Sequence, residues 1–352
     1  MAKFRVGIIG CGGICKAAHI PAYLLEKRAE IVAVCDIKPE RAEFVRKTFF
    51  RNAKTYTDYK ELLKDESIDY VDICTPNYLH SIIAVDALNA GKNVLCEKPD
   101  AVSVEEALKM KEASEKNGKR LMIIRNNRYI GTSQNVRKLI DAGEFGEFYA
   151  GRCGWVRRRG IPGKGGWFTT KAMSGGGPLI DLGVHMIDLA IWFMGNPKPV
   201  SVSGNTFCKF ADCDVSDSPE SKFGDKVEGG TFDVEDLAMG FIRFDNGAVL
   251  QIEFSWASNI KKERRFVELR GDKAGLSWHG GKADVFYEVN GKQKNKKVSG
   301  RTLDGHKNNI SHFIDVLEGS AEPIFVPEQG IDMIKILSAI YESAKTGKEV
   351  LL

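Results

Sequence analysis

Residues 4–15 have the sequence FRVGIIGCGGIC, in which an apolar run is followed at once by closely spaced glycines. The apolar run predicts a buried β-strand, and the stretch after the glycines predicts a helix. Glycines permit a tight turn and let backbone N–H groups approach a pyrophosphate at the start of that helix. The next apolar run, residues 31–35, leads to Asp36, whose carboxylate can accept hydrogen bonds from ribose hydroxyls. We therefore predict a dinucleotide site that contains Gly10, Gly12, Gly13, Ile14 and Asp36.

The acidic residue at position 36 bears on the choice of dinucleotide. A carboxylate there repels the 2′-phosphate of NADP, which favours NAD. Lys38 and Arg41 could each reach a phosphate, so NADP is the less favoured alternative. Asp36 could also cap a helix that starts at Pro39, and the two roles are compatible. The third position of the glycine fingerprint holds Cys15, whose small side chain predicts a slightly wider helix–strand crossing without loss of function.

Strand and helix patterns alternate up to about residue 125 and then change. The alternation predicts a doubly wound parallel sheet, a Rossmann fold, over residues 1–125. Longer strand candidates follow with few helices between them, at residues 148–156, 200–207, 237–244, 249–256 and 265–270. Asn246-Gly247 is a hairpin signal. We therefore predict an α/β protein whose second domain, residues 126–352, is α+β with a large, open, mostly antiparallel sheet. Its last helices could pack back on the first domain, and the polar residues 211–230 predict an inserted surface loop.

Composition excludes several classes of function. The 352 residues are 43% hydrophobic and 28% charged, as in a soluble globular protein of about two domains. A formal net charge of +4 gives no basis for nucleic-acid binding. No terminal segment resembles a signal peptide, and no apolar run reaches the roughly 20 residues that span a bilayer, so we expect a cytoplasmic protein without a membrane partner. The eight cysteines include no CxxC pair, and we expect reduced thiols and no metal site.

The segment NVLCEKP, residues 93–99, contains the first candidate for chemistry. Its apolar centre predicts a short buried strand, which Pro99 ends because proline lacks a backbone donor. The carboxyl ends of parallel strands face the ligand crevice, so Lys98 is directed at the molecule that binds there. Without a dinucleotide site upstream, Lys98 would be interpreted as an ordinary surface lysine.

A second candidate lies in the sequence GGGPLIDLGVHMID, residues 175–188. Three glycines before Pro178 predict a helix start, and Asp181 and His185 are four residues apart on one helix face. Asp188 follows about one turn later. A carboxylate beside an imidazole can orient the ring or favour its protonated form, which suits acid/base catalysis. Such a pair alone is more often structural, but the dinucleotide site favours the catalytic interpretation.

Together these motifs resemble the glucose–fructose oxidoreductase and inositol dehydrogenase family (Gfo/Idh/MocA). The resemblance rests on the glycine turn, Asp36, Thr75-Pro76-Asn77 with His80, Glu97-Lys98-Pro99, and the glycines before Asp181 and His185. It implies a Rossmann domain and a C-terminal domain whose open sheet commonly forms the face of a homodimer or homotetramer. It also implies NAD(P)-dependent oxidation or reduction of a CH–OH group in a sugar, glycoside or cyclitol.

The resemblance further implies roles for single residues. The catalytic positions of the family are matched by Lys98, Asp181 and His185. Positions at the nicotinamide end of the cofactor are matched by Thr75, Asn77, His80, Glu97 and Lys98. The substrate side is expected to include Arg128, Trp167, Asp181 and His185. The sequence departs from the family pattern at Cys15 and in the loop 211–230.

The sequence does not decide which side chain transfers the proton. His185, oriented by Asp181, could move the hydroxyl proton while Lys98 binds the same oxygen, or Lys98 could itself be the base. Trp155, Trp167 and Phe168 could stack on a sugar, although core packing is expected for at least one of them.

The substrate and the reaction class are open as well. The basic residues 157–159 could form a solvated, mobile loop or contact an anionic substrate. Two other functions fit the fold: a glycosidase that oxidises its sugar transiently with bound NAD, and a regulator that binds NAD without chemistry. The presence of Lys98, Asp181 and His185 argues against the regulator.

Overall fold

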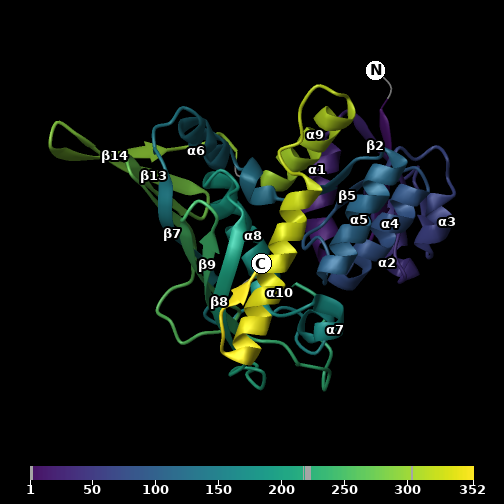
Figure 1. The fold of residues 1–352 in the computed structure, drawn as a ribbon. Helices are drawn as coiled ribbons and strands as arrows, with labels where there is room; N and C mark the ends of the chain where they lie inside the picture. The colour runs from purple at the N-terminus through teal and green to yellow at the C-terminus, as the bar shows by residue number, and fades with distance from the viewer. Residues whose placement is uncertain (1–2, 217, 219–222, 303) are drawn as a thin grey trace. The chain divides into compact units, whose positions relative to one another are not determined.

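The computed structural model describes residues 3–216, 218, 223–302 and 304–352. The chain forms two compact units, one of Met1–Ile124 with His306–Ile331 and one of Arg125–Gly305 with Asp332–Leu352. Each unit is built on its own sheet (Figure 1). The predicted α/β fold class, with a parallel sheet and a separate, mostly antiparallel sheet, is confirmed.

The sheet of the first unit has six parallel strands in the order β3-β2-β1-β4-β5-β6. The strands are β1 (Phe4–Ile9), β2 (Ala29–Cys35), β3 (Lys54–Tyr56), β4 (Tyr70–Ile73), β5 (Asn93–Cys96) and β6 (Leu121–Ile123). This is the strand order of a Rossmann fold, which reverses direction between β1 and β4. Dinucleotides bind at that reversal, beyond the carboxyl ends of the strands.

The helices of the first unit follow the strands in alternation. Within residues 3–124 they are η1 (Cys15–His19), α1 (Ile20–Leu25), α2 (Pro39–Thr48), α3 (Tyr59–Leu63), η2 (Asn77–Leu79), α4 (His80–Asn89) and α5 (Val104–Asn117). The segment η1 is a single π-helical turn in the helix predicted after the glycines. Such turns occur frequently at functional sites. Here the turn ends at His19, whose side chain is completely buried.

The returning segment, His306–Ile331, belongs to the core of the first unit through α9 (Gly305–Leu317). Ile310, Phe313 and Ile314 are completely buried in the same hydrophobic cluster as β1 and β4. The Phe313 ring meets the ring of Tyr70 edge-on, with centroids 5.2 Å apart. The apolar face of α9 therefore completes a core that residues 1–124 begin.

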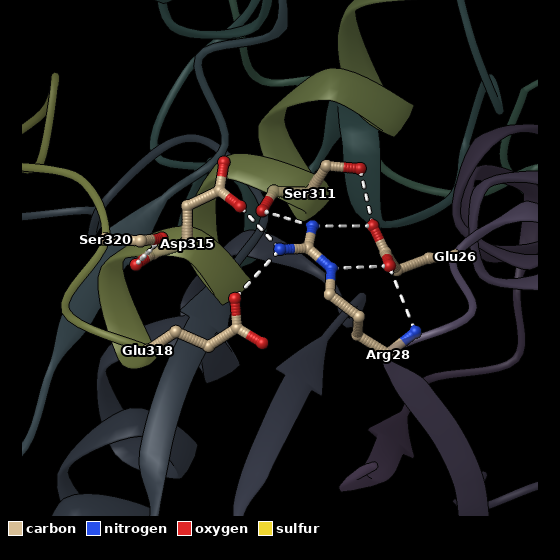
Figure 2. Close-up of polar contacts among 6 residues, drawn as sticks. All are labelled: Glu26, Arg28, Ser311, Asp315, Glu318 and Ser320. Carbon is tan, nitrogen blue, oxygen red and sulfur yellow. Dashed lines mark hydrogen bonds and ion pairs between the residues drawn. The ribbon is translucent and has the colours of Figure 1, made fainter. Parts of the chain in front are cut away.

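A polar network also holds the returning segment (Figure 2). The Arg28 guanidinium donates to Asp315 at 2.6 Å and to Glu318 at 3.0 Å. Glu26 accepts from Arg28 through both carboxylate oxygens and from the Ser311 hydroxyl at 2.7 Å. The hydrogen bonds from Arg28 lower the pKa of Glu26 to about 2. α9 is thus fixed by both packing and charge.

The sheet of the second unit has nine strands in the order β14-β13-β12-β11-β7-β10-β9-β8-β15. They are β7 (Phe148–Val156), β8 (Pro199–Phe207), β9 (Leu237–Phe244), β10 (Val249–Ser255), β11 (Arg264–Gly271), β12 (Ala274–His279), β13 (Lys282–Val289), β14 (Lys292–Val298) and β15 (Val350–Leu351). β7 and β10 pair in parallel, and every other described pair is antiparallel. The five predicted strands and the Asn246-Gly247 hairpin are confirmed, whereas β12 to β15 were not predicted.

A long apolar helix, α8 (Pro178–Phe193), packs on β7, β10 and β11. The other helical segments that include residues of this unit are η3 (Asn126–Tyr129), α6 (Gly131–Asp141), η4 (Trp167–Thr169), α7 (Lys171–Ser174) and α10 (Pro327–Thr346). By length and composition the stretch Lys171–Phe193 could span a membrane, but 89% of its most apolar window is buried inside the structure, as in a core helix.

The loop predicted at residues 211–230 is described at 211–216, 218 and 223–230, where it has no helix or strand; the rest of it lies outside the described residues. Its described part packs on the segment that follows β7. Ser218 N–H donates to the Arg159 carbonyl at 3.0 Å, and Val227 N–H donates to the Lys164 carbonyl at 3.0 Å. The interpretation of residues 157–159 as a solvated run is wrong for Arg157, which is 5% exposed.

Candidate active site

The turn after β1 has the shape that a dinucleotide site needs. Gly10 has a φ of +97°, and a Cβ at this position would lie 2.6 Å from the Cys74 carbonyl oxygen. Only glycine fits there. A Cβ at Gly12 would meet no described atom within 4 Å, so the backbone of the turn stays open to a ligand.

Asp36 is fixed against this turn. Its Oδ2 accepts from the Cys11 N–H at 2.8 Å, and its Oδ1 accepts from the Lys38 N–H at 2.9 Å. Each carboxylate oxygen has a further lone pair that can accept from a ribose hydroxyl. The carboxylate is therefore held where the fingerprint places the ribose, and it also organises the glycine turn.

His80 links the loop after β4 to the loop after β5. Its Nδ1 lies 2.7 Å from the Pro99 carbonyl oxygen, and its Nε2 lies 2.9 Å from the Thr75 carbonyl oxygen. Carbonyl oxygens only accept, and burial lowers the pKa of His80, so the neutral ring donates to one of them at a time. His80 thus positions the Lys98 loop from inside the unit.

The neighbouring Thr75 supports a cofactor at this edge. Its Oγ1 is buried without a hydrogen-bond partner among the residues that the structure describes. A buried hydroxyl without a partner is costly, and a bound dinucleotide would offer it polar groups. Asn77, at the start of η2, is 6% exposed. The open glycine turn, the fixed Asp36 carboxylate and the Thr75 hydroxyl together fit NAD.

A cluster that sequence reasoning missed surrounds Glu97, immediately before Lys98. The Glu97 Oε1 atom lies 2.9 Å from His19 Nε2 and 3.3 Å from His306 Nε2. The other ring nitrogen of His19 lies 2.7 Å from Asp72 Oδ2. Asp72 was the available signal, because a carboxylate inside a fully buried strand needs a partner. His306 lies far along the chain and carries no comparable signal.

In the second unit, Asp181 and His185 lie on α8 as predicted. Asp181 is 8% exposed, and its Oδ2 accepts from the Trp256 indole N–H at 2.9 Å. The His185 ring lies 5.8 Å from the Trp155 ring, centroid to centroid. Aromatic side chains from two strand ends thus flank Asp181 and His185.

The glycines before α8 are required by close packing. A Cβ at Gly176 would lie 2.0 Å from the Tyr341 hydroxyl, and one at Gly177 would lie 2.0 Å from the Glu235 carbonyl oxygen. Glu235 caps the helix, because its carboxylate accepts from the N–H groups of Gly177 at 2.9 Å and Leu179 at 3.0 Å. The start of the helix that carries Asp181 is therefore fixed.

Arg128, predicted to bind substrate, is 1% exposed and binds Asp188 through two nitrogens, at 2.8 and 2.7 Å. Arg125 donates to the same carboxylate at 3.0 Å. The described contacts give Arg128 a role in holding α8, and its contact with substrate stays a prediction.

Trp167 lies in an aromatic group near Asp181. Its ring stacks on the Phe168 ring with centroids 3.8 Å apart, and Phe168 meets Trp256 edge-on at 6.5 Å. Trp256 is completely buried, while Trp167 and Phe168 are partly exposed. This arrangement offers an aromatic surface on which the apolar face of a sugar could stack.

The predicted residues thus divide between the two units. Those for the cofactor, with Lys98, belong to the first unit, and Asp181, His185, Arg128 and Trp167 belong to the second.

Comparisons with known proteins cover both units. A family model described as "Oxidoreductase family, NAD-binding Rossmann fold" matches residues 4–124, and the "GFO/IDH/MocA C-terminal domain" model matches residues 133–277. The D-glucoside 3-dehydrogenase of Escherichia coli is 34% identical over 99% of this chain and 97% of its own. The levoglucosan dehydrogenase of Pseudarthrobacter phenanthrenivorans is 29% identical over 78% of this chain and 73% of its own.

The fold is found again in solved structures. A levoglucosan dehydrogenase in complex with NADH and levoglucosan superposes with a TM-score of 0.84 at 24% identity, over 99% of both chains. Because two family models and a full-length relative match, the chain belongs to the Gfo/Idh/MocA family of NAD-binding oxidoreductases.

Proposed function

We propose that this protein is an NAD-dependent dehydrogenase that oxidises a secondary hydroxyl of a sugar, with the 3-position of a D-glucoside as the leading substrate. The observation that carries the proposal is similarity to D-glucoside 3-dehydrogenase along almost the whole of both chains. A relative named glucose-6-phosphate 3-dehydrogenase, 29% identical over 82% of this chain, adds support for the same ring position.

The reaction needs a hydride acceptor and a group that takes the hydroxyl proton. Bound NAD⁺ supplies the acceptor for the hydride that leaves the carbinol carbon. Lys98 and His185 are proposed to share the substrate oxygen, one taking its proton and the other stabilising its negative charge. Asp181 is proposed to orient His185, and the Trp256 N–H donates to Asp181. Trp167 and Phe168 are proposed to contact the sugar face.

A substrate panel tests the function. Purified protein is incubated with NAD⁺ or NADP⁺ and with methyl D-glucosides, levoglucosan, glucose 6-phosphate or myo-inositol, and NADH absorbance is followed. We expect the largest kcat/KM with a D-glucoside, and NMR of the product should show a ketone at C3. Oxidation of inositol alone would contradict the glucoside assignment. Cleavage of a glycoside without net NADH formation would indicate the glycosidase instead.

The cofactor preference is expected to depend on Asp36. We expect NAD to be favoured over NADP in kcat/KM, and Asp36→Ser to reduce that preference by roughly tenfold or more. Serine removes the charge that repels the 2′-phosphate, and Lys38 or Arg41 can then approach it. The measurement is kcat/KM with each cofactor, and Asp58→Ser, an exposed helix cap in the same unit, is the control. Wild-type protein that uses NADP equally well would contradict the assignment.

The second sheet is proposed to form a homodimer or homotetramer. One face of this sheet is covered by α8. The strand pairing places the side chains of Met239 and Phe286 on the opposite face, where they are 38% and 42% exposed. A sheet face that no described helix covers and that exposes apolar side chains among charged ones is proposed as the subunit interface. Met239→Asp should reduce the mass measured by light scattering to that of a smaller oligomer. Met173→Asp, at an exposed methionine of α7, should leave it unchanged.

We also propose a cytoplasmic location, because all eight cysteines are free thiols, as is usual in a reducing compartment.

A further inference from the structure

His19 and His306 both contact the carboxylate of Glu97, the residue before Lys98. These three residues form a cluster that we name the histidine clamp. His19 comes from the π-helical turn, Glu97 follows β5, and His306 lies in the first turn of α9. The side chains of His19 and Glu97 are 0% and 5% exposed, and that of His306 is 16% exposed. The clamp is therefore a buried polar group to which the returning segment contributes.

The contacts of His19 determine its charge. Each of its ring nitrogens faces a carboxylate, Asp72 at 2.7 Å and Glu97 at 2.9 Å. Ionised carboxylates only accept, so both contacts are hydrogen bonds only when the ring carries two protons. Burial alone would lower the pKa of His19, but the two carboxylates raise it well above its ordinary value. His19 is thus a buried imidazolium between two carboxylates.

The Glu97 carboxylate is correspondingly held in its ionised form. Burial alone would raise the pKa of Glu97, but the hydrogen bonds and charges of His19 and His306 hold it well below its ordinary value. Charge-assisted hydrogen bonds of this kind are about twice as strong as neutral ones and constrain geometry. The carboxylate therefore has one preferred orientation.

Hydrogen bonding accounts better than a bound metal ion for the distances between the histidine nitrogens and the Glu97 oxygen. Zinc with ligand bonds of about 2.0–2.1 Å in a tetrahedral site would hold its donor atoms roughly 3.3 Å apart. The His306–Glu97 distance of 3.3 Å fits either case, but the His19–Glu97 distance of 2.9 Å is that of a direct hydrogen bond. The geometry therefore favours a clamp without a metal.

The clamp acts on the backbone that carries Lys98. While Glu97 Oε1 faces the two imidazoles, Glu97 Oε2 accepts from the Lys98 N–H at 3.1 Å. On the other side, His80 contacts the Pro99 carbonyl oxygen. The residues before and after Lys98 are thus both held from inside the first unit.

We propose that His306 and His19 are positioning residues, which hold Glu97 and through it fix the direction of the Lys98 side chain. This inference rests on the proposed function of Lys98 at the substrate oxygen. The returning segment would then contribute to catalysis. The packing of Phe313 and the Arg28 network (Figure 2) fix α9, and α9 carries the His306 that contacts Glu97. Displacements of about 1 Å in a catalytic group can cost about 10²-fold in rate.

Three variants of the full-length protein test the proposal. His306→Leu removes the Glu97 contact, and His306→Gln keeps an N–H donor near the position of Nε2. His312→Leu is the matched control, because His312 is a partly buried histidine on the same helix whose Nε2 accepts from the Ile324 N–H at 3.3 Å. For each variant we would measure kcat, KM for sugar, NADH affinity, melting temperature and bound metal.

We expect His306→Leu to lower kcat roughly 10- to 100-fold, with NADH affinity and KM for sugar changed less than about threefold. His306→Gln should recover most of the rate, and His312→Leu should keep it. Equal rates for His306→Leu and wild type, equal losses for His306→Leu and His312→Leu, or stoichiometric zinc in the wild type would overturn the proposal.

A readout without turnover separates the clamp from the proposed function. Crystal structures of wild type and both leucine variants should show the Lys98–Pro99 backbone displaced only in His306→Leu. An undisplaced loop overturns the clamp even if the enzyme is a sugar dehydrogenase. A wild type that oxidises no sugar contradicts the proposed function, and the comparison of loops still decides whether the clamp exists.

Discussion

Replacing Lys98 or His185 by alanine is expected to lower kcat by roughly 10² or more in each variant, the usual scale for losing a positioned acid/base or oxyanion donor. NADH should still bind with near wild-type affinity. The glycine turn and Asp36 are fixed by their own contacts, Gly10 against Cys74 and Asp36 against backbone N–H groups, and neither depends on the side chains of Lys98 or His185. The loss should therefore be confined to the chemical step.

The variant that combines Lys98→Ala with His185→Ala shows whether the two side chains act in the same step of the reaction. If both side chains act on the same substrate oxygen, the double variant should lose less than the product of the two single losses. Asp181→Asn should cause a smaller loss and a shifted pH profile, because it perturbs His185 without removing it. The measurements are steady-state rates across pH and NADH fluorescence titrations.

Matched controls show whether the loss is specific. Lys116→Ala removes an exposed lysine of the first unit, and His279→Ala removes an exposed histidine of the second. Both should keep the wild-type rate. Lysine and histidine variants at positions 98 and 185 with unimpaired turnover would falsify the assignment and leave the family fold without the proposed mechanism.

The Rossmann half of the fold was predictable because its information is local. Apolar runs, glycine turns and helical spacing within short segments predict most of the strand–turn–helix units, and the parallel order follows from connectivity rules. The exception is β3, whose three residues KTY carry no apolar run and were not predicted as a strand. In the second sheet β12 to β15 were missed. At one edge, β14 has the sequence KQKNKKV and is exposed except at Val298, so it shows no apolar run. A signal was present: Asn290-Gly291, with φ values of +52° and +72°, forms the hairpin turn between β13 and β14.

The candidate site also contains residues that the sequence predicts and residues that it does not. Lys98, Asp181 and His185 lie in local motifs that the sequence displays, whereas their supports come from distant segments. Glu235 caps α8 from another part of the chain, and His306 reaches Glu97 through the returning segment. Such pairings depend on which elements pack together, and no local periodicity encodes that.

Asp188 is also paired with distant residues, because its two arginine partners precede it by 60 and 63 residues. Its carboxylate accepts from Arg128 Nε at 2.8 Å, Arg128 Nη2 at 2.7 Å and Arg125 Nε at 3.0 Å. The side chains of all three residues are at most 5% exposed. A carboxylate that neutralises two buried guanidinium groups ties η3 to the helix that carries Asp181 and His185.

Asp188→Asn is accordingly expected to lower the free energy of unfolding by about 3–5 kcal/mol, the usual cost of breaking a buried ion pair. The cost arises because both guanidinium groups stay charged and buried after their counter-ion is removed. Urea unfolding of wild type and variant measures it. Asp141→Asn is the control, since Asp141 pairs with Arg137 at the surface, where its side chain is 56% exposed and solvent screens the pair. If Asp188→Asn destabilised the protein no more than Asp141→Asn, the carboxylate would not be what holds α8 to the arginines.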